Sequence, residues 1–170
     1  MPECIYSSPV GALSLSSENG FLTALRFAEK SQPNTVPEKP TDDPVLLRTV
    51  EWLDRYFGGL RPRPSELPLN PRGSDFQKAV WAHLCDIPYG ETVSYGALAA
   101  KLAGDGHRLL ARAVGGAAHL NPIAIIIPCH RVIGSDGSLT GYAGGMDRKA
   151  RLLRFEGVDI VSDRLFPKNT

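Results

Sequence analysis

Four prolines between Arg61 and Gly73 most constrain how this chain can fold. They are Pro62, Pro64, Pro68 and Pro71. Proline lacks a backbone N–H and holds φ at roughly −65°, so neither a helix interior nor a central strand accepts so many. The stretch predicts an extended connection between one domain at residues 1–73 and a second at 74–170. A chain of 170 residues is long enough for two small domains.

The first part predicts a small β-rich unit with one helix. Asn19-Gly20 is typical of a hairpin turn between two segments in which apolar and polar residues alternate. Asp43 can cap a helix that has Pro44 in its first turn. The expected elements are strands at 12–16 and 23–27, a polar loop at 31–40 and a helix at 44–57. No pattern here indicates chemistry, so we interpret this part as structural support.

The second part predicts a helix-turn-helix and a buried strand. Ser74 and Gln77 form a capping box that opens a first helix, and Ser94 can cap a second. Asn121-Pro122 stops a third helix. The expected later elements are helices at 95–102, 109–120 and 146–155, a buried strand at 123–127 and a Gly-rich hairpin region at 134–145. Many helix pairs of this kind bind nothing, so the motif alone assigns no function.

Composition excludes several classes of protein. Hydrophobic residues make up 42% and charged residues 22%, as in an ordinary globular chain. The longest apolar run, Ile123 to Ile127, is too short to span a bilayer, and the N-terminus does not resemble a secretory signal. Three cysteines at wide spacing do not form a disulfide framework, which favours a reducing cytoplasm.

The net charge of +1 conceals an uneven distribution. Between Lys101 and Arg154 there are eight basic and three acidic residues, a net charge of +5, whereas residues 1–73 are near neutral. The basic residues are Lys101, Arg108, Arg112, Arg131, Arg148, Lys149, Arg151 and Arg154. On charge alone, a solvated face and a nucleic-acid contact remain equal alternatives.

Cys129 is the candidate nucleophile. It follows a buried apolar run and Pro128, so we expect it at the N-terminus of a short helical turn, where the dipole favours a thiolate. His130 could accept its proton directly or through a water, and Glu156 is a candidate partner to orient that histidine. The alternative is a buried, inert cysteine beside a surface histidine. The residues alone support the catalytic and the inert interpretation of Cys129 about equally.

The other cysteines and histidines do not predict a metal site. Cys85 lies near the end of a helix, where core packing explains it, and Cys4 lies near the terminus. The clustered spacing of a zinc site is missing from the sequence. A cysteine hydrolase that uses Cys129, His130 and Glu156 is an alternative function, and it would turn over repeatedly.

Several motifs together resemble one family, the O6-alkylguanine-DNA alkyltransferases of the bacterial constitutive type. They cover about half the chain, in the family's order: Gly73-Ser74-Asp75-Phe76-Gln77, Ile87 to Tyr95, Ala111 to Gly116, Asn121-Pro122, Ile127 to Val132, Gly141 to Gly145 and Leu152 to Gly157. The resemblance implies a mixed α/β (α+β) fold. An N-terminal ribonuclease-H-like domain would precede a C-terminal winged-helix-like domain.

The resemblance also implies a role for each matched residue. Cys129 would accept the alkyl group, His130 would act through a water as its base, and Glu156 would orient His130. Asn121 would hold the turn that joins the DNA-binding helix to the active-site strand, and Tyr95 would help extrude the nucleotide and donate to the departing guanine. The implied DNA contacts are Arg112, which would replace the extruded base, with Tyr95, Ala113, Gly115 and Ser135. The implied pocket for the base comprises Val132, Tyr142, Ala143 and Gly144.

The implied function is direct-reversal repair of DNA. The chain would enter the minor groove of double-stranded DNA and flip out O6-alkylguanine, or less well O4-alkylthymine, because a stacked base is out of reach. Irreversible transfer to Cys129 limits each molecule to one turnover. We expect a monomer with no cofactor, no metal and no membrane contact. A non-catalytic protein that binds alkylated lesions is a further alternative.

Two features depart from the family pattern. The turn from Gly104 to Leu110 is longer than usual, and Arg108 within it could contact a phosphate. Ala143 stands where some relatives have serine, so any contact with the base there must come from the backbone.

Overall fold

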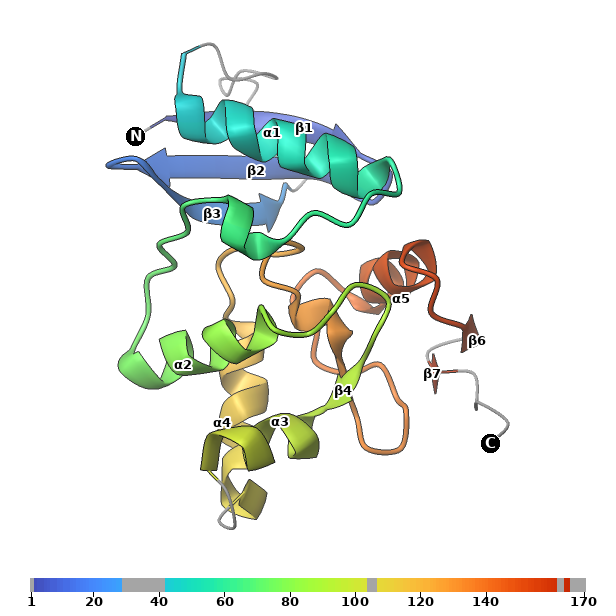
Figure 1. Cartoon of the computed structure of the whole chain (residues 1–170). Coiled ribbons are helices and arrows are strands. Elements are labelled where there is room, and N and C mark those ends of the chain that lie inside the picture. Colours follow the sequence, from blue (N-terminus) through green and yellow to red (C-terminus); the bar gives the residue numbers. More distant parts are fainter. Residues whose placement is uncertain (1, 29–41, 104–106, 162–163, 166–170) are drawn as a thin grey trace. The chain divides into compact units, whose positions relative to one another are not determined.

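The computed structural model describes residues 2–28, 42–103, 107–161 and 164–165. Contacts divide the chain into two compact units (Figure 1). The first comprises Met1–Arg72 with Pro122–Ile126, and the second comprises Gly73–Asn121 with Ile127–Thr170. The expected loop at 31–40 lies outside the described residues.

The first unit is a three-stranded antiparallel sheet covered on one face by a helix. The strands are β1 (Glu3–Ser8), β2 (Gly11–Glu18) and β3 (Phe21–Phe27), paired in the order β1-β2-β3. The predicted hairpin is confirmed, with φ of 52° at Asn19 and 82° at Gly20, as a tight turn of this hand requires. Because side chains alternate along a strand, Leu13 and Leu15 enter the core.

Helix α1 (Pro44–Phe57) has the predicted termini. The carboxylate of Asp43 accepts a hydrogen bond from the backbone N–H of Leu46, Pro44 occupies the first turn, and the helix ends at Gly58. It packs against all three strands. Its buried side chains include Trp52, Leu53 and Tyr56. A short 3-10 turn, η1 (Pro64–Glu66), lies in the proline-rich connection.

The segment from Pro122 to Ile126 joins the first unit, although the sequence on either side of it belongs to the second. The N–H of Leu25 donates to Pro122 O, and the N–H of Ala124 donates to Leu25 O, both at 2.9 Å. The predicted strand at 123–127 is wrong, because only Ile123 forms a bridge, with Leu25. A buried apolar run fits a buried turn as well as a strand.

This turn contains an unusual backbone conformation. Ile125 has a φ of 69°, and the N–H of Ile126 donates to Ala124 O at 2.7 Å, which closes a three-residue γ-turn. A β-branched residue at positive φ is strained and persists only where its surroundings hold it. Ile125 is fully buried, so packing supplies that restraint.

Three helices form the larger part of the second unit. They are α2 (Asp75–Leu84), α3 (Tyr95–Ala103) and α4 (His107–His119). The capping box at Ser74 and Gln77 is confirmed, with both hydrogen bonds present. Helix α4 begins two residues before the predicted Leu109. It packs against α2 and α3, and Trp81 Nε1 of α2 donates to Ala117 O at 2.8 Å.

The remaining elements of the second unit include the short 3-10 helix that contains Cys129. They are β4 (Val93–Ser94), η3 (Cys129–Arg131), β5 (Val132–Ile133), α5 (Met146–Phe155), β6 (Ile160–Val161) and β7 (Arg164–Leu165). β4 and β5 pair in parallel. A small core joins β5, α5 and β6 through Ile133, Leu139, Ala150, Leu153 and Ile160. No described helix has the length and apolar character needed to cross a bilayer.

Candidate active site

Cys129 lies at the first position of η3. Pro128 before it has φ −84° and ψ 63°, and the N–H of Cys129 donates to Ile127 O at 2.8 Å. This inverse γ-turn reverses the chain directly before the cysteine. The Cys129 side chain is buried, with the residue only 8% exposed, so access of a reagent to the sulfur is restricted.

Asn121 ties the end of α4 to the nucleophile. Its Nδ2 donates to Ile127 O at 2.8 Å and to Cys129 Sγ at 3.2 Å. Asn121 follows α4 by two residues, so one amide group links the helix terminus, the reversed turn and the sulfur. The family resemblance implied that Asn121 holds the turn after α4, and its hydrogen bond to Ile127 O reaches the later turn directly before Cys129. The hydrogen bond to sulfur adds electrostatic support for a thiolate.

Burial governs the protonation of Cys129. It raises the pKa of the thiol, and the Asn121 hydrogen bond and the Lys149 cation lower it only in part. We expected the dipole of the following turn to favour the thiolate. That turn has three residues, too few for a substantial dipole, and the net shift of the pKa is upward. The cysteine therefore needs a base close by.

His130 and Glu156 form a buried pair. His130 Nε2 lies 2.6 Å from Glu156 Oε2, and both side chains are fully buried. Arg131 donates to the same carboxylate through Nε at 2.8 Å and Nη2 at 3.1 Å, and the N–H of Gly90 donates at 3.0 Å. Four donors thus fill the carboxylate. Burial opposes its ionisation, but His130 and Arg131 outweigh burial and hold the pKa of Glu156 well below its usual range.

The other ring nitrogen of His130 is available. Nδ1 is buried and has no hydrogen-bond partner among the described residues. Burial lowers the pKa of His130 despite the neighbouring Glu156 carboxylate, so the ring is neutral. An ionised carboxylate at Nε2 holds the proton on that nitrogen. The lone pair of Nδ1 can then accept a proton.

Tyr95 and Lys149 meet at one carbonyl. The Tyr95 hydroxyl and Lys149 Nζ both donate to Thr140 O at 2.9 Å, and Nζ also donates to Val132 O at 2.5 Å. Lys149 is fully buried. Burial and the Cys129 thiolate raise the pKa of Tyr95 to about 12. Tyr95 is therefore a hydroxyl donor at neutral pH.

Arg131 and Lys149 are site residues that our reading of the sequence missed. We counted both only as positive charges. Lys149 could have been found, because it falls at helical spacing on the apolar side of α5 with Met146, Ala150 and Leu153. Arg131 directly follows Cys129-His130, but no local pattern identifies Glu156 as its partner. Both are buried, so these two of the eight basic residues do not contribute to an exposed positive face.

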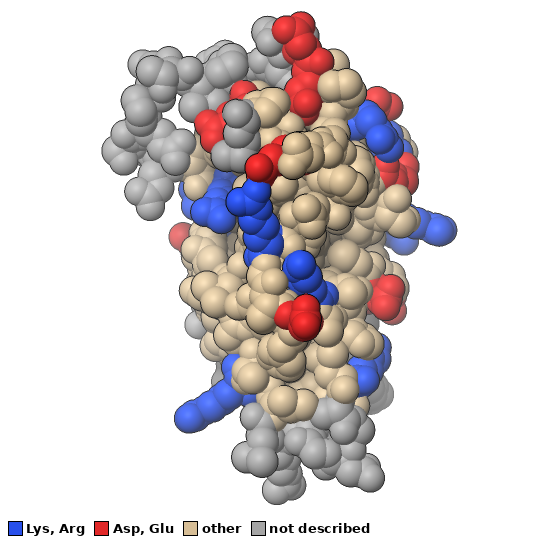
Figure 2. All heavy atoms as spheres, turned by 90° about the vertical axis from the view of Figure 1, so that its left-hand side faces the viewer, with Lys and Arg blue, Asp and Glu red and all other residues tan. Residues whose placement is uncertain are grey.

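The surface drawn in Figure 2 is correspondingly mixed in charge. Basic and acidic side chains of the described residues are interspersed there among uncharged ones instead of forming one basic patch. Of the turn expected from Gly104 to Leu110, residues 107–110 belong to helix α4, and residues 104–106 and the Arg108 side chain lie outside the described residues. A moderate basic excess fits a DNA contact that depends partly on insertion of a side chain.

Helix α4 exposes one long side chain, that of Arg112, among residues 110–118, whose side chains the structure describes. Arg112, Ala113 and Gly116 are exposed, whereas the intervening Val114 is buried. Gly115 lies beside the Tyr95 ring, because a Cβ there would be 3.8 Å from it. The small residues leave the Arg112 side chain prominent on this face. Such a surface permits close approach to another molecule.

Val132 begins β5, and the other remaining predicted residues occupy the turn and the loop that follow it. Ser135 and Ala143 are exposed, Gly144 is half-buried, and Val132 and Tyr142 are buried. Burial and the Cys129 thiolate raise the pKa of Tyr142. His119 Nδ1, at the end of α4, lies 3.2 Å from Gly141 O in the same loop.

The other two cysteines have no comparable setting. Burial raises the pKa of Cys4 and of Cys85 to about 11 in each case, so both are thiols at neutral pH. Within the described part of the chain, no three His, Cys, Asp or Glu side chains come together in a way that could hold a metal ion.

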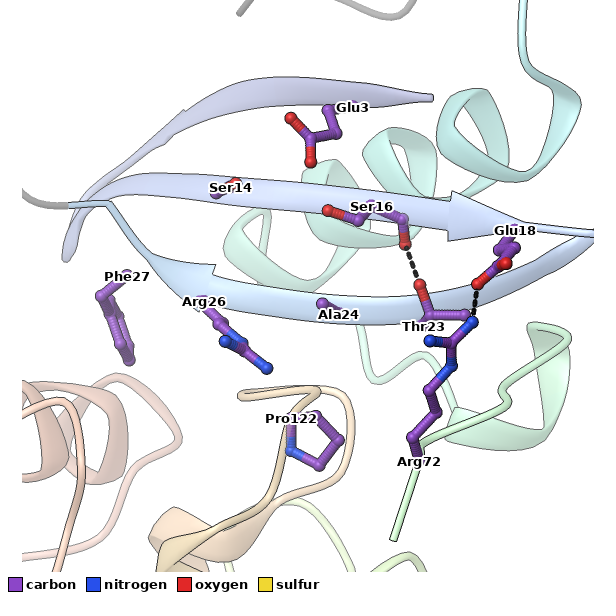
Figure 3. A pocket seen from close by; sticks show the side chains of 10 residues that line it. All are labelled: Glu3, Ser14, Ser16, Glu18, Thr23, Ala24, Arg26, Phe27, Arg72 and Pro122. Carbon is purple, nitrogen blue, oxygen red and sulfur yellow. Dashed lines mark hydrogen bonds and ion pairs between the residues drawn. The ribbon is translucent and has the colours of Figure 1, made fainter. Parts of the chain in front are cut away.

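A pocket of about 520 Å³ lies entirely within the first unit (Figure 3). Ser14 and Ser16 line it from the strand face opposite to Leu13 and Leu15. Its charged lining residues are Glu3, Glu18, Arg26 and Arg72. Arg72 forms an ion pair with Glu18. Carboxylates and guanidinium groups thus offset one another, and neither cysteine nor histidine lines the pocket.

The arrangement in the second unit defines a class of protein: a buried cysteine beside a His–Glu pair and next to a helix-turn-helix. The chain belongs to the 6-O-methylguanine DNA methyltransferase family. Its residues 3–71 match the family's ribonuclease-like domain, and residues 75–158 match the DNA binding domain. These two matches confirm the expected fold, an N-terminal ribonuclease-like domain followed by a C-terminal DNA-binding domain.

Curated relatives named methylated-DNA–protein-cysteine methyltransferase come from bacteria and archaea. The one from Mycobacterium tuberculosis is 45% identical over 149 residues, with 88% of each chain covered. The one from Haemophilus influenzae is 42% identical over 158 residues, covering 92% of this chain and 86% of the relative. The crystal structure of the Mycobacterium tuberculosis O6-methylguanine methyltransferase matches with a TM-score of 0.77 and 43% identity. The match covers 91% of this chain and 92% of the crystallised one. A complex from the same organism with DNA also matches with a TM-score of 0.77, at 44% identity over 92% of each chain.

Proposed function

We propose that this chain repairs O6-alkylguanine in DNA by transferring the alkyl group to Cys129. Repair of O6-methylguanine is the activity of the family to which it belongs. The observation that carries the assignment to Cys129 is the buried His130–Glu156 pair, which leaves His130 Nδ1 available directly after the cysteine. The thiols of Cys4 and Cys85 have no such neighbour.

The proton of Cys129 passes to His130. A water between Sγ and Nδ1 would carry it, because the described residues give neither atom a direct hydrogen bond to the other. The resulting imidazolium faces the Glu156 carboxylate, which Arg131 and Gly90 keep ionised and in place. Asn121 and Lys149 stabilise the thiolate before substrate binds. The pair thus offsets the cost of ionising a buried thiol.

The thiolate then attacks the alkyl carbon. A carbon–sulfur bond forms, the bond from carbon to O6 breaks, and the electron pair leaves with the guanine. The Tyr95 hydroxyl donates a hydrogen bond to this departing anion, which finally gains the proton that the thiol lost. The product is a thioether that ordinary acids and bases cannot cleave. Each molecule therefore acts once, and the scheme uses no cofactor or metal.

The exposed face of α4 is the proposed contact with the minor groove of double-stranded DNA. Ala113 and Gly116 allow close approach, and Arg112 is long enough to fill the space left by an extruded base. Gly115 lets Tyr95 pack beside the helix. Ser135, in the exposed turn after β5, is a further candidate contact.

The extruded base would occupy the space bordered by Val132 and the loop from Tyr142 to Gly144. Carbonyl groups near Cys129 and Val132 would read the guanine amino group. Val132 O already accepts from Lys149, and Cys129 O accepts from the N–H of Val132, so each retains one lone pair for the base. Ala143 offers only its backbone there. O4-alkylthymine would bind less well because it lacks the amino group.

We further propose that the protein acts as a monomer in the cytoplasm. Its three cysteines are free thiols, and a reducing compartment keeps the acceptor available. Double-stranded DNA is the only partner that the proposed chemistry needs.

The mass of the Cys129 peptide tests the proposal. Incubation with duplex DNA containing O6-methylguanine should add one methyl group to that peptide, and product should plateau near one equivalent of protein. Cys85→Ser is the matched control and should behave as wild type, whereas Cys129→Ser should lose transfer. Repeated turnover would indicate a hydrolase, and tight lesion binding without any alkylated cysteine would indicate a binding protein.

A further inference from the structure

The loop from Thr140 to Gly144, which borders the proposed base pocket, begins against two helices. Thr140 O accepts a hydrogen bond from the Tyr95 hydroxyl of α3 at 2.9 Å, and the next carbonyl oxygen, Gly141 O, lies 3.2 Å from His119 Nδ1 of α4. A carbonyl oxygen only accepts hydrogen bonds, so Nδ1 is the donor and carries the proton. Side chains of the helix-turn-helix therefore hold two consecutive carbonyls of this loop.

Gly141 fits this position because it has no side chain. Its φ is 73°, in the left-handed region, and a Cβ there would lie 3.2 Å from the Tyr95 hydroxyl oxygen. Glycine adopts this conformation at no steric cost and permits close approach. The loop can therefore pass beside Tyr95 in the conformation in which the Gly141 carbonyl meets His119.

The two contacts have different fates in the proposed reaction. If Tyr95 turns to donate to the departing guanine, it no longer donates to Thr140 O. The hydrogen bond between His119 and Gly141 does not involve Tyr95, so it persists when the base is present. The start of the loop thus stays connected to α4 during the step that needs the pocket.

His119 is the last residue of the helix that forms the proposed DNA contact. Two residues later, Asn121 donates to the nucleophile turn and to Cys129 Sγ. The C-terminal end of α4 is therefore connected both to the nucleophile and to the loop beside the base. His119 itself is exposed, so its replacement should have little effect on the stability of the fold.

We infer that His119 is a positioning residue, which fixes the start of the base-pocket loop to the end of α4 while Tyr95 changes partner. The inference rests on the proposed function. It requires the N–H donor at Nδ1, and it predicts a change in affinity for the base without a change in the reactivity of Cys129. A single hydrogen bond has a modest net effect, equivalent to about a two- to tenfold change in an equilibrium constant.

Three variants separate the hydrogen bond from other effects of the residue. His119→Ala removes the donor. His119→Asn keeps an N–H donor, because the amide nitrogen of asparagine is as many bonds from the backbone as Nδ1 of histidine. His83→Ala is the matched control, since His83 also lies in the last turn of a helix, α2.

Three measurements follow the loop, the pocket and the sulfur. Amide hydrogen exchange of the peptide at 140–145, without substrate, reports how firmly the loop is held. Free O6-benzylguanine must occupy the base pocket to alkylate Cys129, so its rate against concentration gives a half-saturating value. Iodoacetamide alkylates the same sulfur without the need to fill the pocket, so its rate reports the reactivity of Cys129.

We expect His119→Ala to speed exchange of this peptide and to raise the half-saturating concentration of O6-benzylguanine, each at least twofold. The iodoacetamide rate should stay within twofold of wild type. His119→Asn and His83→Ala should stay within twofold of wild type in all three measurements.

A His119→Ala protein whose exchange or half-saturating concentration stays within twofold of wild type would overturn the inference. So would an equal loss in His119→Asn, because the donor would then not be responsible, or an equal slowing of the iodoacetamide reaction. The exchange measurement does not depend on the reaction. If exchange responds as expected but neither O6-benzylguanine nor methylated DNA alkylates Cys129 of the wild type, the proposed function fails while the contact between His119 and the loop stands.

Discussion

His130 Nε2 lies 2.6 Å from Glu156 Oε2, and neither side chain is exposed to solvent. The contact joins residues 26 positions apart and determines which ring nitrogen can serve as a base. Because Arg131 and Gly90 also donate to Glu156, the carboxylate is held from several directions and cannot turn away from the histidine. A single carboxylate thus orients the base and compensates a buried guanidinium.

Glu156→Gln should be strongly destabilising. The change leaves Arg131 buried without a counter-charge, which typically costs about 3–5 kcal/mol of folding free energy. Urea unfolding measures the loss. Glu66→Gln is the control, because Glu66 forms a partly exposed pair with Arg55 and should cost about 1 kcal/mol or less. Comparable losses in the two variants would show that the buried network contributes little.

Asn121→Ala should raise the pKa of the Cys129 thiol above its already raised value. The variant loses the hydrogen bond from Nδ2 to Sγ, which favours the thiolate. The rate of iodoacetamide addition to the Cys129 peptide, followed by mass spectrometry against pH, should therefore have a higher midpoint than in wild type. Modification of Cys85 in the same samples is the internal reference. A midpoint that stays or falls argues against the sulfur contact.

Arg112→Ala should impair repair of duplex DNA selectively. Without the long side chain, the space left by the extruded base is unfilled, so flipping is less favourable. We expect at least a tenfold lower rate on duplex O6-methylguanine and less than a threefold change with free O6-benzylguanine. Lys78→Ala, on α2, should change neither rate. Equal losses on both substrates would contradict the assigned role.

Acid should destabilise the fold through two buried groups. The lowered pKa of His130 means that the unfolded chain takes up a proton near pH 6.5 that the folded chain does not, so stability falls as pH drops below about 6.5. The pKa of Glu156 is also lowered. Its contribution is complete above about pH 4.3 and is lost as pH falls towards the folded value.

Urea unfolding at several pH values between 7 and 5 checks this dependence. The contribution of one histidine approaches about 1.4 kcal/mol per pH unit well below its unfolded pKa. His130→Gln should remove it. A slope that persists in the variant would assign the dependence to other groups.

Short-range features of this protein were predictable from its sequence. The cap at Asp43, the capping box at Ser74 and the hairpin at Asn19-Gly20 each depend on residues within a few positions, and all three are present. Cys129, His130 and Glu156 could be proposed by residue type and by family resemblance. Their distances could not, since they depend on packing between distant segments.

The buried run at 123–127 shows where prediction fails. Its apolar residues indicated burial correctly, but the pairing of Leu25 with Ile123 and the turn at Ile125 depend on a strand almost one hundred residues away. Lys149 and Arg131 show the same limit, since charge predicts exposure until a buried partner is known.

The sequence by itself determined the class of the chain, its local caps and turns, and the presence of a cysteine followed by histidine after a proline. Tertiary structure alone decided which charges are buried, which nitrogen of His130 is available and which carbonyl Tyr95 shares with Lys149. The reason is physical: caps and turns are stabilised by near neighbours, whereas burial, pKa and hydrogen-bond saturation are set by segments that only the fold brings together.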